Sequence, residues 1–147
     1  MSAMTLFAKT AASICLAGFL SVSASAQDLH LYVDKGGDHV YLGCFSCNEY
    51  SSDSIWNEFG KYGSEFSSDS IWNAFGSFGS EFSPYSPWNE FSSQSPVLVD
   101  RSGNFYGYFT CNRFRSNRVD DNLMDLMCKY RDDIRKNRSR WYGAIIR

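Results

Sequence analysis

A sixteen-residue unit occurs three times between residues 50 and 96, and its period limits the possible folds of this chain more than any other feature. The spacing of sixteen relates three sets of residues: Trp56, Trp72 and Trp88; Asn57, Asn73 and Asn89; and Phe59, Phe75 and Phe91. Sixteen is not a multiple of 3.6, so the units cannot continue as one α-helix with a constant apolar face. A short unit repeated in tandem is typical of stacked coils. The sequence therefore predicts a small three-coil solenoid.

The third unit indicates how each coil begins. Ser86-Pro87 stands where the other units have Ser-Ile, and proline is favoured at the first helical position after a serine cap. One helical turn per unit is therefore predicted, in which a Trp and a Phe three residues apart share a face. The units hold few aliphatic side chains, so these aromatic residues are expected to form the core: Trp56, Phe59, Trp72, Phe75, Trp88 and Phe91. The alternative is a glycan- or cell-wall-binding repeat, in which exposed tryptophans stack on sugar rings.

Local patterns on either side of the repeat predict two hairpins and a helix. Residues 29–43 alternate around a Gly-Gly turn, and residues 96–111 flank a turn that contains Gly103 and Asn104. Over residues 119–138 apolar residues recur every three or four positions, with acids first and bases last, which predicts an amphipathic helix. The apolar tail from Trp141 to Ile146 is expected to dock as an edge strand. The predicted fold class is α+β and β-rich.

The first 26 residues have the features of a signal peptide. Lys9 precedes an apolar run that is too short to span a bilayer, and Ala24-Ser25-Ala26 matches a cleavage site. Cleavage after Ala26 would leave residues 27–147 as a single secreted or periplasmic domain without a transmembrane segment.

Four cysteines follow the predicted cleavage site: Cys44, Cys47, Cys111 and Cys128. An even number in an exported chain indicates disulfides, and three pairings are possible. We prefer the two pairs of sequence neighbours, Cys44–Cys47 and Cys111–Cys128. A redox pair at the C-x-x-C motif and a four-cysteine zinc site are less favoured, because the chain lacks a βαβ frame and a second C-x-x-C. No metal or other cofactor is predicted.

Residues 42–110 resemble a family of uncharacterised, mostly bacterial sequences. These sequences share a C-x-x-C motif, tandem SIWN-x-[YF]-G repeats and a closing D-x-x-GN-[FY]-YG-Y hairpin, all of which occur in this chain. The resemblance implies no particular activity. The C-terminal part, with Cys111, Cys128 and the basic helix, falls outside the shared pattern.

Charge is divided unevenly along the chain. Residues 27–100 carry two basic and eleven acidic residues (net −9), whereas residues 101–147 carry eleven basic and five acidic residues (net +6). Either the two parts attract each other within one fold, or the basic part binds an anionic envelope surface or an acidic partner. Six residues are expected to contact a partner: Tyr50, Tyr62, Tyr85, Arg131, Arg135 and Arg138.

The chain contains no P-loop, dinucleotide fingerprint or nucleophile elbow. The sequence therefore predicts a non-catalytic binding or interaction module of the bacterial envelope or exterior, whose partner is unknown. The alternative from a different class is a small enzyme, with a redox function at the C-x-x-C motif or a hydrolytic site around His39.

Overall fold

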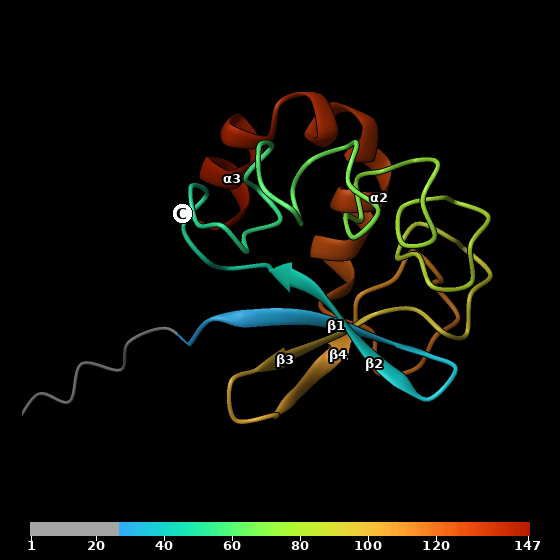
Figure 1. Ribbon diagram of the computed structural model, residues 1–147. Helices are drawn as coiled ribbons and strands as arrows, with labels where there is room; N and C mark the ends of the chain where they lie inside the picture. Colours follow the sequence, from blue (N-terminus) through green and yellow to red (C-terminus); the bar gives the residue numbers. More distant parts are fainter. Residues whose placement is uncertain (1–26) are drawn as a thin grey trace, which may run out of the picture.

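The computed structural model describes residues 27–147. A four-stranded antiparallel sheet forms one side of the molecule, at the bottom of the view in Figure 1. Its strands are β1 (Leu29–Lys35), β2 (Asp38–Cys44), β3 (Val97–Asp100) and β4 (Phe105–Tyr108), in the order β2-β1-β3-β4. Gly36 and Gly37 join β1 to β2 with φ of 67° and 95°, as a tight hairpin turn requires. Both predicted hairpins are confirmed. The predicted signal peptide lies outside the described residues.

Two helices lie on the opposite side, α2 (Asp121–Lys136) and α3 (Arg138–Ile145) (Figure 1). The first confirms the predicted amphipathic helix, and it begins where the Asp120 carboxylate accepts a hydrogen bond from the Leu123 amide at 2.9 Å. The tail docks on the body as expected, but as a helix and not as an edge strand. Its apolar residues recur at helical spacing, which lets Tyr142 pack edge-on against Trp56 at 5.9 Å.

The repeat is a chain of tight turns, and the predicted single helical turn in each unit is wrong. Each turn closes when an amide donates to a carbonyl three residues earlier, or four residues earlier at one step. In the first unit the turns begin at Ser51, Ser54, Asn57, Gly60 and Ser64, and the next unit begins at Ser67. The steps are three, three, three, four and three residues, which together make the period of sixteen.

Serine and asparagine residues that begin these turns also stabilise them through their side chains. The Ser54 hydroxyl accepts a hydrogen bond from the Trp56 amide at 3.1 Å, and the Asn57 side-chain oxygen accepts one from the Phe59 amide at 3.1 Å. The later coils repeat both contacts. Serine and asparagine favour turns because they satisfy nearby main-chain amides in this way. The longer step needs glycine, since a Cβ atom at Gly63 would lie 1.8 Å from the Asn57 carbonyl oxygen.

The three repeat tryptophans form a buried ladder, as the core prediction required. Trp56, Trp72 and Trp88 are only 2%, 1% and 3% exposed, and the ring centroids of successive pairs lie 6.2 and 5.2 Å apart. Each indole N–H donates a hydrogen bond to a main-chain carbonyl of the preceding layer of the stack. The acceptors are the carbonyls of Phe45 (2.6 Å), Ile55 (2.7 Å) and Ile71 (2.5 Å), in the order of the tryptophans. The alternative of exposed tryptophans that stack on sugars is therefore wrong.

Two disulfides, Cys44–Cys47 and Cys111–Cys128, confirm the preferred pairing. The first lies where β2 leads into the first coil. The second joins the segment that follows β4 to the middle of α2, across 17 residues of sequence. It therefore holds the helix against the end of the solenoid.

Candidate functional site

Six phenylalanines project into solvent with more than four-fifths of their surface exposed. They are Phe59 (91%), Phe66 (86%), Phe75 (100%), Phe82 (83%), Phe91 (86%) and Phe114 (94%). The prediction that Phe59, Phe75 and Phe91 belong to the core is wrong. That prediction assumed a helical turn, in which residues three apart share a face. In the observed chain of turns, residues three apart belong to successive turns, so the tryptophan points inward and the phenylalanine outward.

All six phenylalanines end the same three-residue turn, in which a serine or asparagine comes two positions before. Three follow the repeated asparagine, two follow Ser64 and Ser80, and the sixth is Phe114 in Asn112-Arg113-Phe114. The Asn112 side-chain oxygen accepts from the Phe114 amide at 3.0 Å, and its amide group donates to the Ser92 carbonyl at 2.9 Å. A sixth projecting turn, which the sequence repeat does not reveal, therefore continues the series beyond the second hairpin.

The middle residue of three such turns reaches across to α2. These ion pairs are Glu65–Arg135 at 3.9 Å, Glu81–Arg131 at 3.3 Å and Arg113–Asp125 at 3.3 Å. Glu65 and Glu81 stand one coil apart, and their partners stand one helical turn apart. The fit is geometric, because the tryptophan spacing of 5.2–6.2 Å is close to the helical pitch of about 5.4 Å. The distance from one coil to the next is therefore close to the distance from one turn of α2 to the next, and we call this distance the shared step of coil and helix.

A groove runs between these turns and α2, and we call it the phenylalanine groove. It consists of four adjoining hollows, the largest of about 770 Å³, and neighbouring hollows share lining residues. On the coil side it is bounded by Phe66, Phe75, Phe82, Phe91 and Phe114, and on the helix side by Leu126, Tyr130, Arg131 and Arg135. The helix is kinked within this stretch, because the φ and ψ of Tyr130 (−106° and 16°) are not helical.

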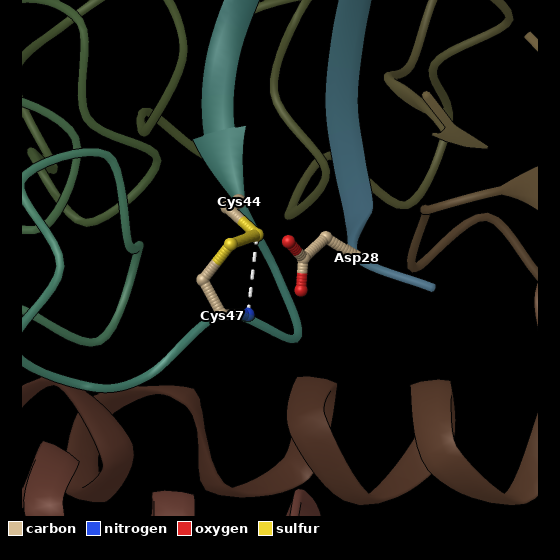
Figure 2. A group of neighbouring side chains, drawn as sticks. All are labelled: Asp28, Cys44 and Cys47. Carbon is tan, nitrogen blue, oxygen red and sulfur yellow. Dashed lines mark hydrogen bonds between the residues drawn. A yellow bond between two sulfur atoms is a disulfide. The ribbon is translucent and has the colours of Figure 1, made fainter. Parts of the chain in front are cut away.

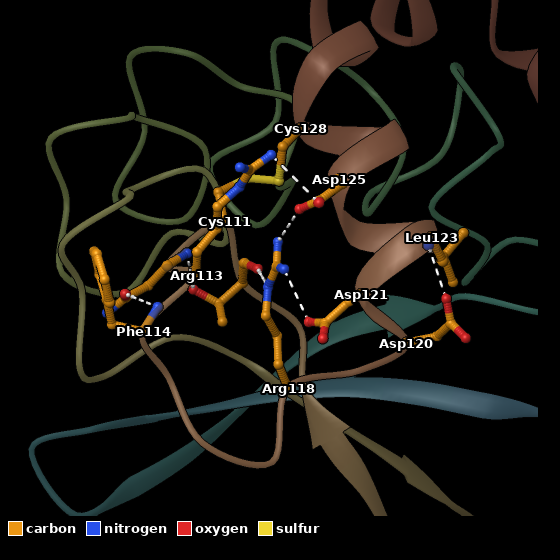
Figure 3. A network of polar contacts seen from close by, with 11 residues as sticks. Cys111, Arg113, Phe114, Arg118, Asp120, Asp121, Leu123, Asp125 and Cys128 are labelled. Carbon is orange, nitrogen blue, oxygen red and sulfur yellow. Dashed lines mark hydrogen bonds and ion pairs between the residues drawn. A yellow bond between two sulfur atoms is a disulfide. The ribbon is translucent and has the colours of Figure 1, made fainter.

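The widest end of the groove is held in place by covalent and ionic cross-links (Figure 3). Cys111–Cys128 lines it, and Arg118, whose side chain is only 5% exposed, donates to the Thr110 carbonyl at 2.8 Å. The same guanidinium pairs with Asp121 and Asp125 of α2, each at 3.0 Å. The segment that carries Phe114 is thereby fixed against the first half of the helix, so the groove is formed before any partner binds.

The structure places two of the six predicted contact residues in the groove. Arg131 and Arg135 line it, with side chains 27% and 23% exposed, and they join the acidic part of the chain to the basic part. Arg138 is only 4% exposed and lies over the Trp72 ring at 5.8 Å, so its prediction as a surface contact is wrong. Burial also lowers the pKa of its guanidinium. Its aliphatic stem and position at the start of α3 carry it beneath the first coils.

The three predicted tyrosines lie away from the groove. Tyr50 is exposed, as predicted, but Tyr62 is half-buried against the Tyr41 ring at 5.0 Å. Tyr85 is half-buried beneath the Lys35 ammonium, 5.6 Å from its ring. The tyrosines therefore do not form one contact surface.

Asp28, Cys44 and Cys47 make the single group of three potential metal ligands within the described residues (Figure 2). The two sulfur atoms are bonded to each other, so neither thiolate is available to a metal in this state. The Asp28 carboxylate is also paired with Arg101 at 3.0 Å. His39, the other predicted catalytic candidate, is exposed on β2, and catalysis at either place stays a prediction.

Comparison with protein-family models, with curated proteins and with solved structures finds no match to this chain. Over residues 27–147, no helix combines the length and hydropathy needed to cross a membrane. Function is therefore inferred from the groove itself.

Proposed function

We propose that this protein is a non-catalytic binding protein of the cell envelope or exterior, and that the phenylalanine groove holds an apolar segment of a partner protein. The observation that carries the proposal is the set of phenylalanines, 83–100% exposed, beside a preformed groove. The two disulfides support an oxidising compartment outside the cytoplasm.

The size of the exposed apolar surface supports a macromolecular partner. At about 150–250 Å² for each aromatic side chain, the five exposed phenylalanines that bound the groove offer on the order of 1,000 Å². The largest apolar patch on a typical monomer is roughly 300–600 Å², and one side of a standard protein interface buries about 800 Å². This surface therefore has the area of a complete interface.

Charge favours a protein segment over a lipid surface. Glu90, which precedes Phe91, is an exposed carboxylate on the coil side of the groove, and Glu58, which precedes Phe59, is an exposed carboxylate outside it. Anionic headgroups would be repelled by this edge, whereas a segment with apolar side chains and flanking lysine or arginine would be attracted. The matching partner is therefore an apolar segment with basic flanks.

The test is to select peptides from a displayed random library on the purified wild-type protein and to measure their binding by fluorescence anisotropy. We expect selected peptides to be apolar with basic flanks, and to bind a Phe75→Ser/Phe91→Ser variant at least about tenfold more weakly. The matched control is Phe105→Ser, because Phe105 is a half-exposed phenylalanine on β4, away from the groove. Both variants should retain the wild-type circular dichroism spectrum.

Equal peptide binding by the groove variant and the wild type would contradict the proposal. Two further measurements separate other uses of the same surface. Co-sedimentation with phosphatidylglycerol vesicles would indicate a membrane surface instead. A dimer in sedimentation equilibrium that Phe75→Ser/Phe91→Ser abolishes would indicate that a second copy covers the groove.

A further inference from the structure

A second cavity, of about 520 Å³, lies on the sheet and shares no lining residue with the phenylalanine groove. It is enclosed by the tip of the β1–β2 hairpin, by residues 93–97 and by the segment that follows β4. Its volume is within the range of pockets that hold small molecules, about 300–1,000 Å³.

The apolar wall of this cavity is a row of cross-strand neighbours. Tyr32 of β1 pairs with Val97 of β3, and Val97 pairs in turn with Tyr108 of β4. Paired residues place their side chains on the same face of a sheet, so the three lie side by side. The Tyr32 ring and the neighbouring Val97 side chain suit a flat, apolar group.

Two polar groups of the cavity have no partner among the described residues. Ser95 is only 4% exposed, and its hydroxyl makes no hydrogen bond. The Arg115 guanidinium carbon lies 3.8 Å from the centroid of the Tyr108 ring, and the buried Nε–H of Arg115 has no acceptor among the described residues. Buried polar groups are nearly always hydrogen-bonded, and an unmet donor costs about 1–3 kcal/mol. These two donors therefore mark where a ligand's acceptor atoms would lie.

Two further titratable side chains line the cavity, Asp34 and His39. Asp34 accepts a hydrogen bond from the Gly37 amide at 2.8 Å, which fixes its carboxylate within the hairpin turn. By contrast, Arg115 has no ion pair with any described residue. Arg115 therefore offers a guanidinium without an ion-pair partner, in a cavity that the Ser95 hydroxyl also lines.

We infer that this cavity is a binding site for a small organic carboxylate. The carboxylate accepts hydrogen bonds from Arg115 and from the Ser95 hydroxyl, and the apolar part of the ligand lies on Tyr32 and Val97. A planar guanidinium matches a planar carboxylate and binds it through paired, charge-assisted hydrogen bonds. This site does not depend on the function proposed for the groove.

The experiment is an NMR titration of the ¹⁵N-labelled protein with benzoate, and with benzamide as a neutral ligand of the same shape. Benzoate is expected to shift the Arg115 Nε–H resonance and the Ser95 amide at millimolar concentration, and benzamide to bind at least about tenfold more weakly. Arg115→Gln should weaken benzoate binding at least about tenfold, and Ser95→Ala by several-fold. The matched control is Arg140→Gln, an exposed arginine of α3, which should leave binding unchanged.

The inference is overturned if benzoate causes no shifts around Ser95 and Arg115, or if Arg115→Gln binds it as well as the wild type does. Equal binding of benzamide and benzoate would likewise overturn it, because the carboxylate would then contribute nothing. Folding of each variant is checked from the dispersion of its own amide spectrum.

Discussion

The contrast between inward tryptophans and outward phenylalanines can be tested within a single coil, with Trp72→Phe and Phe75→Ala. Trp72 is 1% exposed and its N–H donates to the Ile55 carbonyl at 2.7 Å. Trp72→Phe keeps one ring but leaves that carbonyl unpaired, at about 1–3 kcal/mol, and loses buried apolar atoms worth roughly 1–2 kcal/mol more. We expect a loss of about 2–4 kcal/mol in the free energy of unfolding. Phe75 is 100% exposed, so Phe75→Ala should change the free energy of unfolding by less than about 0.5 kcal/mol.

Urea unfolding followed by far-ultraviolet circular dichroism, with the disulfides kept oxidised, measures both variants. A matched control is Trp141→Phe, since the Trp141 indole also donates a hydrogen bond, at 2.7 Å, but from a half-buried ring to the exposed carboxylate of Asp133. Its cost should stay below about 1 kcal/mol. If Phe75→Ala destabilises the protein as much as Trp72→Phe does, the assignment of an inner and an outer side to each coil is refuted.

Two further predictions concern the cross-link at the groove and the second hairpin. Replacement of both Cys111 and Cys128 by serine should lower the free energy of unfolding by about 3 kcal/mol, whereas replacement of both Cys44 and Cys47 should lower it by about 2 kcal/mol. The first loss is larger because the Cys111–Cys128 disulfide closes the longer loop. Urea unfolding of the two double variants checks this order. The pKa of Asp100 is lowered because its carboxylate accepts hydrogen bonds, first from the Asn104 side chain and also from main-chain amides and Tyr106. The contribution of Asp100 to the free energy of unfolding is therefore complete above its ordinary pKa of 3.8, and it is lost as the pH falls through the lower pKa of the folded state. The difference in the free energy of unfolding between wild type and Asp100→Asn should be constant near neutral pH and shrink in acid. Urea unfolding at a series of pH values measures this difference.

The sequence predicts those parts of the fold that local chemistry decides. Gly36-Gly37 supplies the two positive φ angles of the first hairpin, and the apolar stripe ahead of Arg135 and Lys136 identifies α2. The tryptophan core was also predictable, because the units hold little else to bury. The prediction that Phe75 points inward was wrong, since its direction depends on whether the backbone forms a helical turn or successive tight turns. The serine or asparagine two positions before each exposed phenylalanine was the signal that could have decided it.

The groove could not be predicted from the sequence, because it exists only where α2 lies along the coils. Its ion pairs join residues far apart in the chain, such as Glu65 with Arg135 and Glu81 with Arg131. Opposite charge in the two parts of the chain indicated that they attract, but not which carboxylate meets which guanidinium. Asn112-Arg113-Phe114 was overlooked because the second hairpin separates it from the repeats it resembles.

The shared step of coil and helix has a consequence for how such a chain could change in length. Duplication of one sixteen-residue unit, together with four residues in α2, would add one coil, one helical turn and one further ion pair, and would leave the earlier contacts in register. Loss of the same two segments would shorten the protein without disturbing its ends. The groove can therefore be lengthened in whole units, each of which adds two phenylalanines. Small tandem duplications would change the length of the partner segment that fits in the groove, without redesign of the binding site.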